Sequence, residues 1–106
     1  MWTLIFANTA AETEVEELPR EMRASFERII GMIRANGLER MREPYVKHVD
    51  GKIWEMRLTG RDGIARSLYM TAKGRRVAVL RTFIKKTEKT PRREIEIALE
   101  RAKEVK

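Results

Sequence analysis

The stretch DGKIWEMRLTGRDGIARSLYMTAKGRRVAVLRTFI, residues 50–84, decides the fold. Asp50-Gly51, Asp62-Gly63 and Lys73-Gly74 recur in it twelve and eleven residues apart. Asp-Gly is a strong signal for a tight hairpin turn, and Lys-Gly is a weaker one. The segments between these turns are strand-like. The stretch therefore predicts consecutive strands joined by tight turns, which is an antiparallel meander.

The strands themselves show two hydropathy patterns. Apolar and charged side chains alternate along residues 54–58, the period of a half-buried strand, and Trp54 is expected in the core. Further strands are expected over Ile64 to Thr71 and Arg76 to Ile84. Val77 to Leu80 is apolar throughout, which indicates a strand that is covered on both faces.

Helices are expected both before and after the meander in the sequence. The short apolar run from Trp2 to Ala7 predicts a first strand, and Ala10 to Leu18 predicts a short acidic helix. Pro19 suits the first turn of a second helix, which Asn36-Gly37 ends. One apolar face of that helix comprises Met22, Phe26, Ile29, Ile30 and Ile33.

The last helix is expected to begin at Thr90-Pro91, with Thr90 as its N-cap and Pro91 at the first helical position. Its apolar face comprises Ile95, Ala98, Leu99 and Ala102. The order is a strand, two helices, a four-strand meander and a helix. We therefore expect one α+β domain over residues 1–106, with helices packed on a curved sheet.

The amino-acid composition excludes several classes of protein function. The 106 residues include no cysteine, which excludes disulfides and thiolate chemistry and favours an intracellular, cytoplasmic protein. The first residues lack the pattern of a signal peptide, and no apolar run has the length of a membrane span. No metal site and no cofactor are expected, because the chain has one histidine and no carboxylates at ligand spacing.

The charge is unevenly distributed along the chain. Residues 1–39 hold four Arg and seven Glu, a net charge of −3, whereas residues 40–106 hold nineteen Lys and Arg against nine acids, a net charge of +10. The basic part suits a polyanion, and nucleic acid is the first candidate. A solvated basic surface remains the alternative.

Several cations lie on the predicted strands. If the hairpins pair in register, Arg57, Arg66 and Arg81 approach one face of the sheet, with Lys85 and Lys86 just beyond it. Arginine forks onto phosphate oxygens, so this face fits an RNA backbone. Alternatively, Arg57 and Arg66 pair with Glu55 or Asp62 across the strands. Arg81 favours the phosphate site, because an unpaired cation inside an apolar strand is costly.

Two other side chains are candidates for chemistry. His48 lies before the first hairpin turn, and histidine titrates near neutral pH. A structural role at the strand end is its alternative. Tyr69 is expected in the core rather than in a site. No nucleophile elbow surrounds either serine, so a hydrolase triad is not expected.

Three segments resemble a known family. They are Gly51-Lys52-Ile53-Trp54-Glu55-Met56-Arg57, the strand Gly63-Ile64-Ala65-Arg66-Ser67-Leu68-Tyr69, and Phe83-Ile84-Lys85-Lys86-Thr87-Glu88-Lys89-Thr90-Pro91 with Glu94-Ile95. Together with the helix order, they resemble the phage-derived, HigB-like branch of the RelE/HigB toxin superfamily. The resemblance covers nearly the whole chain and implies a RelE-like microbial ribonuclease fold.

The resemblance also implies an activity. Such a toxin belongs to a type II toxin–antitoxin pair and acts as an mRNA interferase, a metal-independent endoribonuclease that cuts messages on the ribosome and inhibits translation. The implied partners are ribosome-bound mRNA and a helix-turn-helix, HigA-like antitoxin, through which alone the toxin would reach DNA. In the implied reaction the RNA 2′-OH attacks the adjacent phosphate and leaves a cyclic phosphate.

Carried over by position, Arg57, Arg66, Lys85 and Lys86 match basic residues of the family. The catalytic candidates are Arg57, Arg66, Arg81, Lys85 and His48. The RNA-binding candidates are Lys52, Lys86, Lys89 and Arg76. Arg66 is the leading phosphate ligand. Many relatives carry histidine at the position of Arg81, and a guanidinium is a poor general acid or base, so His48 or a lysine would take over proton transfer.

Two other function classes stay open. The chain could be a non-catalytic nucleic-acid-binding module on the same fold, which the missing histidine favours. It could also be a structural phage protein or a partner-binding protein, in which the basic charge serves an acidic partner.

Overall fold

The computed structural model describes residues 1–61, 63–86 and 88–106. Asp62, expected in a turn and as an ion-pair partner, and Thr87 of the last quoted segment lie outside the described residues. The elements follow the order strand, two helices, four strands and a helix. They are β1 (Thr3–Phe6), α1 (Thr9–Glu16), α2 (Arg20–Asn36), the 3-10 helix η1 (Leu38–Arg40), β2 (Val46–Asp50), β3 (Ile53–Gly60), β4 (Gly63–Ala72), β5 (Arg76–Ile84) and α3 (Arg92–Ala102).

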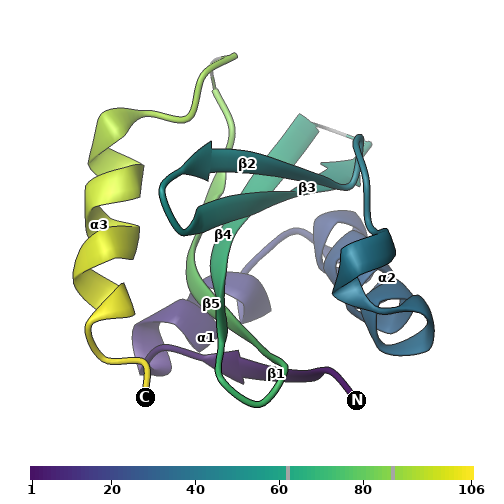
Figure 1. Ribbon diagram of the computed structural model, residues 1–106. Coiled ribbons are helices and arrows are strands. Elements are labelled where there is room, and N and C mark those ends of the chain that lie inside the picture. Colours follow the sequence, from purple (N-terminus) through teal and green to yellow (C-terminus); the bar gives the residue numbers. More distant parts are fainter. Residues whose placement is uncertain (62, 87) are drawn as a thin grey trace.

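The strands form one five-stranded mixed sheet in the order β1-β5-β4-β3-β2 (Figure 1). Strands β2 to β5 pair antiparallel, as the spaced turns predict. Strand β1 pairs with β5 in parallel, with Thr3 opposite Arg76 and Phe6 opposite Val79. Parallel neighbours need a long crossover connection, and the one between β1 and β5 contains both N-terminal helices and strands β2 to β4. The α+β prediction is confirmed.

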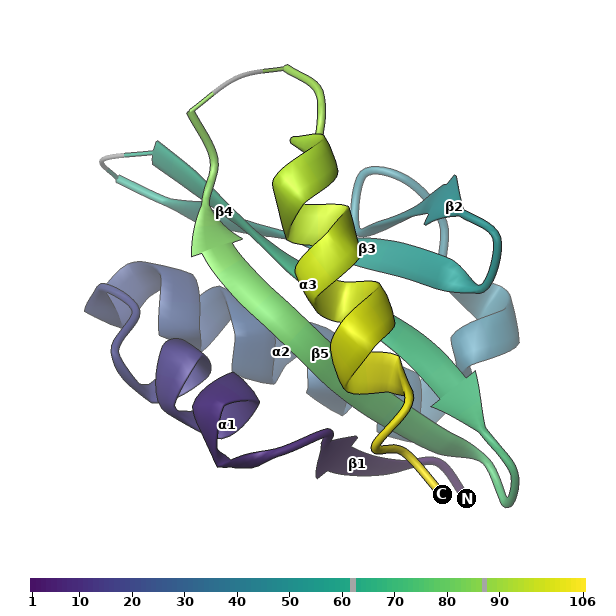
Figure 2. The same cartoon turned by 90° about the vertical axis from the view of Figure 1, so that its left-hand side faces the viewer.

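The helices cover both faces of the sheet. Helices α1 and α2 lie on one face and α3 lies across the other (Figure 2). The α2 side of the core buries the predicted apolar face of α2 against Met56, Leu58 and Tyr69, and the α3 side buries Leu68 and Leu80 against α3. Residues 77–80 of β5 are 0–1% exposed, so this strand is covered on both faces as predicted.

The helix ends follow local chemistry except where α2 and α3 begin. Asn8 caps α1, its Oδ1 accepting from the Ala11 N–H at 2.9 Å. Gly37 ends α2 with a φ of 90°, a conformation that favours glycine. Both begin after a proline at the N-cap position, Pro19 for α2 and Pro91 for α3, with no side-chain cap. Pro19 therefore lies just before the first turn of α2, and the prediction that Thr90 caps α3 is wrong. No helix in the described ranges combines the length and apolar character that crossing a bilayer requires.

Trp54 departs from the prediction that placed it in the core. It lies on the α2 face of β3 and is 40% exposed. Its strand neighbours toward β4 are buried, whereas β2 beyond it is an edge strand. On the β2 side the ring meets only the exposed His48, so it stays partly open to solvent. Tyr69, which pairs with Trp54 across β3 and β4, is 2% exposed and lies in the core as predicted.

Candidate functional site

A polar groove of about 260 Å³ lies where the β2–β3 hairpin meets the start of α3. An ion pair between Asp50 and Arg92, with Oδ2 and Nη1 2.8 Å apart, ties the end of β2 to that helix. The groove is lined by Lys47, His48, Val49, Glu55, Arg66, Glu88, Lys89, Thr90 and Ile95. It therefore gathers three of the residues that the sequence singled out, His48, Arg66 and Lys89.

Arg66 is buried in this groove, with its side chain 6% exposed and that of Glu55 4% exposed. Its Nη1 donates to Glu55 Oε1 at 3.3 Å and to Thr90 Oγ1 at 2.7 Å, and its Nη2 donates to the Glu88 carbonyl at 2.7 Å. The Thr90 hydroxyl donates to Glu55 Oε1 at 2.7 Å. The cross-strand ion pair considered as the alternative is thus formed at Arg66.

The same contacts explain why Thr90 does not cap α3. Its hydroxyl satisfies the buried Glu55 and Arg66, and a buried polar group without a partner costs free energy. The Nε of Arg66 still has no hydrogen-bond partner within the described part of the chain. One nitrogen of the guanidinium therefore remains unsatisfied next to the groove.

Arg57 lies directly opposite Arg66 in the β3–β4 register, so both side chains leave the same face of the sheet. Arg57 is half-buried. Arg57 forms no ion pair within residues 1–61, 63–86 and 88–106. Two arginines thus meet across the strands, and only Arg66 is compensated by Glu55.

His48 is exposed on β2, and its imidazole is fixed by two contacts. Its Nε2 donates to the Gly51 carbonyl at 2.7 Å, and its ring meets that of Trp54 edge-on with centroids 5.2 Å apart. A carbonyl oxygen only accepts hydrogen bonds, so Nε2 carries the proton. In the neutral ring, Nδ1 is then the acceptor.

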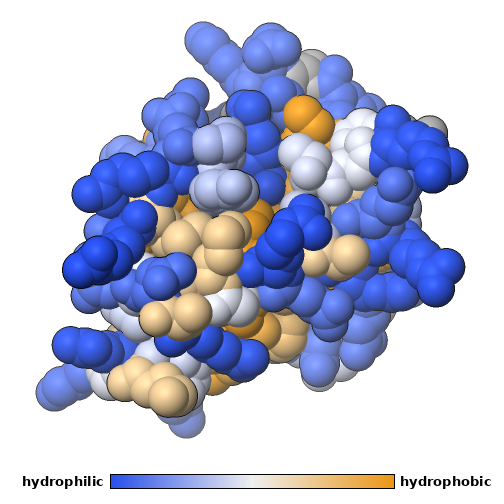
Figure 3. All heavy atoms as spheres, turned by 90° about the vertical axis from the view of Figure 1, so that its right-hand side faces the viewer, coloured by the Kyte–Doolittle hydropathy of each residue, from blue (hydrophilic) through white to orange (hydrophobic). Residues whose placement is uncertain are grey.

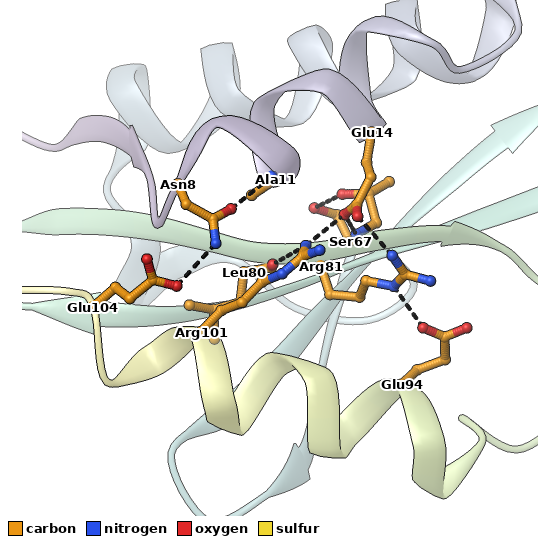
Figure 4. A network of polar contacts seen from close by, with 10 residues as sticks. Asn8, Ala11, Glu14, Ser67, Leu80, Arg81, Glu94, Arg101 and Glu104 are labelled. Carbon is orange, nitrogen blue, oxygen red and sulfur yellow. Dashed lines mark hydrogen bonds and ion pairs between the residues drawn. The ribbon is translucent and has the colours of Figure 1, made fainter.

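Arg81 lies at the centre of a polar network between α1, β5 and α3 (Figure 4). Its Nη1 contacts Glu14 Oε2 and its Nε contacts Glu94 Oε1, each at 2.6 Å. Glu14 also accepts from Arg101 Nη1 at 2.9 Å and from the Thr82 N–H at 3.1 Å. The expectation that Arg81 is an unpaired cation in an apolar strand is therefore wrong.

This network fixes the charge states of its members. Burial raises the pKa of Glu14, but the hydrogen bonds from Arg101 and Thr82 and the charge of Arg81 outweigh it, so the pKa lies below 4.5. Burial lowers the pKa of Arg81, but the hydrogen bond with Glu94 and the interactions with Glu14 outweigh it and raise the pKa above its usual value. Arg81 therefore stays protonated and does not exchange protons near neutral pH.

The remaining candidates lie in different places. The Lys85 side chain is 12% exposed, and its Nζ lies 3.8 Å from Glu88 Oε2. Lys86, the next residue, is exposed. Lys52 is exposed in the β2–β3 turn, at the end of the hairpin that approaches α3. Arg76 is at the opposite end of β5, where it donates to the carbonyls of Lys73 and Lys106. At about 3.3 Å per residue, roughly 25–30 Å separate it from Lys85.

Sequence reasoning missed Thr90 and Glu14 as parts of the two networks, and it considered Glu55 only as an alternative partner of the arginines. Glu55 carried a signal, because it shares a strand face with Arg57 and a cross-strand partner was considered for it. Glu14 carried none, because its contact with Arg81 spans 67 residues of sequence. The described residues contain no group of three or more His, Asp or Glu side chains that could hold a metal ion.

The comparisons with known proteins follow this geometry. A search among curated proteins finds no match. The model of one family, described as "Phage derived protein Gp49-like (DUF891)", matches residues 13–103. The match extends from α1 to the end of α3 and includes the groove and the network around Arg81. The chain therefore belongs to the Gp49-like family of phage-derived proteins, a family associated with RelE/HigB-like toxins of toxin–antitoxin systems.

Proposed function

We propose that this protein is the toxin of a type II toxin–antitoxin pair and that it inhibits translation by cutting mRNA on the ribosome. The groove carries the proposal. There Lys47 and Lys89 lie around the buried Arg66, and His48 lines the β2 edge of the groove with its imidazole against Trp54. Family membership and the net charge of +7 support the same reading, because the substrate is a polyanion.

The proposed reaction needs no metal ion. The RNA 2′-oxygen forms a bond to the adjacent phosphorus, the bond from phosphorus to the 5′-oxygen breaks, and a 2′,3′-cyclic phosphate remains. The 2′-hydroxyl proton passes to a base, for which His48 Nδ1 is the first candidate because Nε2 already carries a proton. Arg57 and Arg66 are proposed to stabilise the extra negative charge on the phosphate oxygens.

The other catalytic candidates receive narrower roles. Arg81 is proposed to position α1 and α3, since its guanidinium contacts Glu14 and Glu94 and stays protonated. Lys85 is proposed to supply positive charge or the proton for the leaving 5′-oxygen. Lys52, Lys86 and Lys89 are proposed to hold the RNA backbone. Arg76 is outside this set, because it lies at the far end of β5.

The partners follow from the same proposal. The toxin acts in the cytoplasm on ribosome-bound message, and a helix-turn-helix antitoxin holds it inactive. DNA is reached only through that antitoxin.

A second candidate function is a non-catalytic nucleic-acid-binding protein on this fold. One observation favours it. Glu55, Thr90 and the Glu88 carbonyl already engage three of the five N–H donors of Arg66, and its side chain is only 6% exposed, which limits its contact with a phosphate. Such a protein would bind RNA with a marked salt dependence and leave ribosome-bound messages intact.

Controlled expression in a bacterial host separates the two functions. We expect growth arrest, with new mRNA 5′ ends confined to translated messages and in phase with codons, because cleavage depends on the ribosome. The matching upstream fragments should end in a cyclic phosphate. Soluble protein that binds RNA but generates no new 5′ ends would favour the non-catalytic function.

Lys86→Ala and Arg76→Ala form a matched pair. Lys86 lies beside the groove end of β5, so its loss should weaken RNA binding and reduce the slope of log affinity against log salt by about one. Arg76 lies at the other end of the strand, so its loss should leave both quantities unchanged. Binding to a short single-stranded RNA at several salt concentrations measures this. Equal effects of the two substitutions would contradict the proposed RNA path.

A further inference from the structure

A second cavity, of about 380 Å³, lies on the opposite face of the sheet from the proposed active site. It lies on the α2 side, where hydrophobic patches reach the surface between hydrophilic side chains (Figure 3). Its lining residues are Trp2, Leu38, Glu39, Met41, Arg42, Val46, Trp54, Tyr69 and Thr71. The volume falls within the range of pockets that hold small ligands.

The walls of this cavity suit a flat aromatic ligand. Both tryptophans of the chain line it, and Trp54 is 40% exposed although its strand neighbours Ile53 and Met56 are buried. An indole held at the surface of a sheet offers a stacking face, and every nucleobase stacks on such a face. The apolar Leu38, Met41 and Val46 exclude water around it.

The cavity also holds a polar group that the fold leaves unused. Tyr69 is 2% exposed and lines the cavity, and within the described part of the chain its hydroxyl has no hydrogen-bond partner. Among the described residues the buried side-chain atom without a partner is Arg66 Nε, so the Tyr69 hydroxyl is accessible from the cavity. Burial raises the pKa of Tyr69, so the hydroxyl keeps its proton and is able to donate.

The rim adds two opposite charges. Glu39 accepts from the Trp2 indole Nε1 at 3.3 Å, which fixes that ring against the carboxylate. Arg42 is exposed, and its Nη1 donates to the carbonyls of Glu39 and Met41. A carboxylate accepts from the exocyclic amine of a base, and a guanidinium binds phosphate. The rim therefore matches the two polar parts of a nucleotide.

We propose that this cavity binds a ribonucleotide, with its base against Trp54 and Trp2, a base nitrogen or oxygen bonded to the Tyr69 hydroxyl, and its phosphate at Arg42. The site is separate from the groove that contains Arg66. Its nucleotide is either free or one unit of an RNA chain that crosses the edge strand β2. Binding does not require cleavage, so it is tested independently of the proposed toxin activity.

Tryptophan fluorescence of the purified full chain tests this proposal, because both indoles line the cavity. Adenosine 5′-monophosphate should change the emission saturably, and ribose 5-phosphate, which lacks a base, should not. Tyr69→Phe should weaken binding by about five- to tenfold, the effect of one lost hydrogen bond. Tyr45→Phe is the matched control, because Tyr45 is 43% exposed and lies outside the cavity.

The outcomes are distinct. No saturable change with adenosine 5′-monophosphate or with a short oligoadenylate would overturn the proposal, and so would equal weakening by the two tyrosine substitutions or equal binding of ribose 5-phosphate. Tighter binding of the oligoadenylate than of the mononucleotide, lost in Tyr69→Phe, would assign the site to an RNA chain. Equal affinities that depend on Tyr69 would assign it to a free nucleotide.

Discussion

We expect Arg66→Ala to lower the free energy of unfolding by about 3–5 kcal/mol and to abolish mRNA cleavage. The stability loss arises because the substitution leaves the Glu55 carboxylate buried without its cationic partner. The activity loss would follow from the proposed phosphate contact. Urea denaturation measures the first effect, and mapping of mRNA 5′ ends measures the second.

Because both effects come from one residue, the double variant Glu55→Gln/Arg66→Ala separates them. It removes the buried charge together with its partner, and Thr90 is still able to bond the amide at position 55. We expect it to recover most of the lost stability without recovering cleavage. Arg57→Ala is the matched control for stability, since no described residue pairs with Arg57, and it should cost less than about 1 kcal/mol. A double variant that cuts mRNA at the wild-type rate would remove Arg66 from the mechanism.

The second large effect is expected at Glu14. Glu14→Gln weakens the contacts to Arg81, Arg101 and the Thr82 N–H at once, and it leaves two partly buried guanidinium groups with less compensation. We expect the free energy of unfolding to fall by about 2–4 kcal/mol, somewhat less than for a fully buried pair. Glu16→Gln, on the exposed side of the same helix, should change it by less than about 0.5 kcal/mol.

This second effect should also depend on pH. The pKa of Glu14 is lowered in the folded protein, so its contribution to stability is present above 4.5 and is lost as the pH falls through the folded-state pKa. The stability difference between wild type and Glu14→Gln should therefore be constant near neutral pH and shrink under acid conditions. Denaturation curves recorded from pH 7 down to pH 3 provide the check. A difference that persists unchanged at the lowest pH would show that the carboxylate charge is not responsible.

The features that depend on neighbouring residues in the chain could be predicted from the sequence. The hairpins follow from turn residues at regular spacing, and the buried face of α2 follows from its helical period, so both were readable without tertiary information. The parallel pairing of β1 with β5 was not readable, because it joins residues more than seventy positions apart and each is compatible with other neighbours.

The candidate site was predicted in part, and its errors share a physical origin. Thr90 has the residue type and position of an N-cap, but its hydroxyl bonds to the buried Glu55–Arg66 pair instead of to the helix backbone. Arg81 was read as unpaired because its acidic partners lie on two other elements, Glu14 on α1, 67 residues before it, and Glu94 on α3, 13 residues after it. Hydropathy periods report which face of an element is buried, but they contain no information about which charge meets which across the fold.

The ion pairs of Glu14 with Arg81 and Arg101 have a consequence during synthesis. Arg101 lies 87 residues after Glu14, near the end of α3, and the segment leading into that helix supplies one wall of the groove around Arg66. A nascent chain therefore cannot complete either structure while α3 is still inside the ribosomal exit tunnel. Under the proposed function, a newly made toxin molecule becomes competent only once α3 has left the exit tunnel.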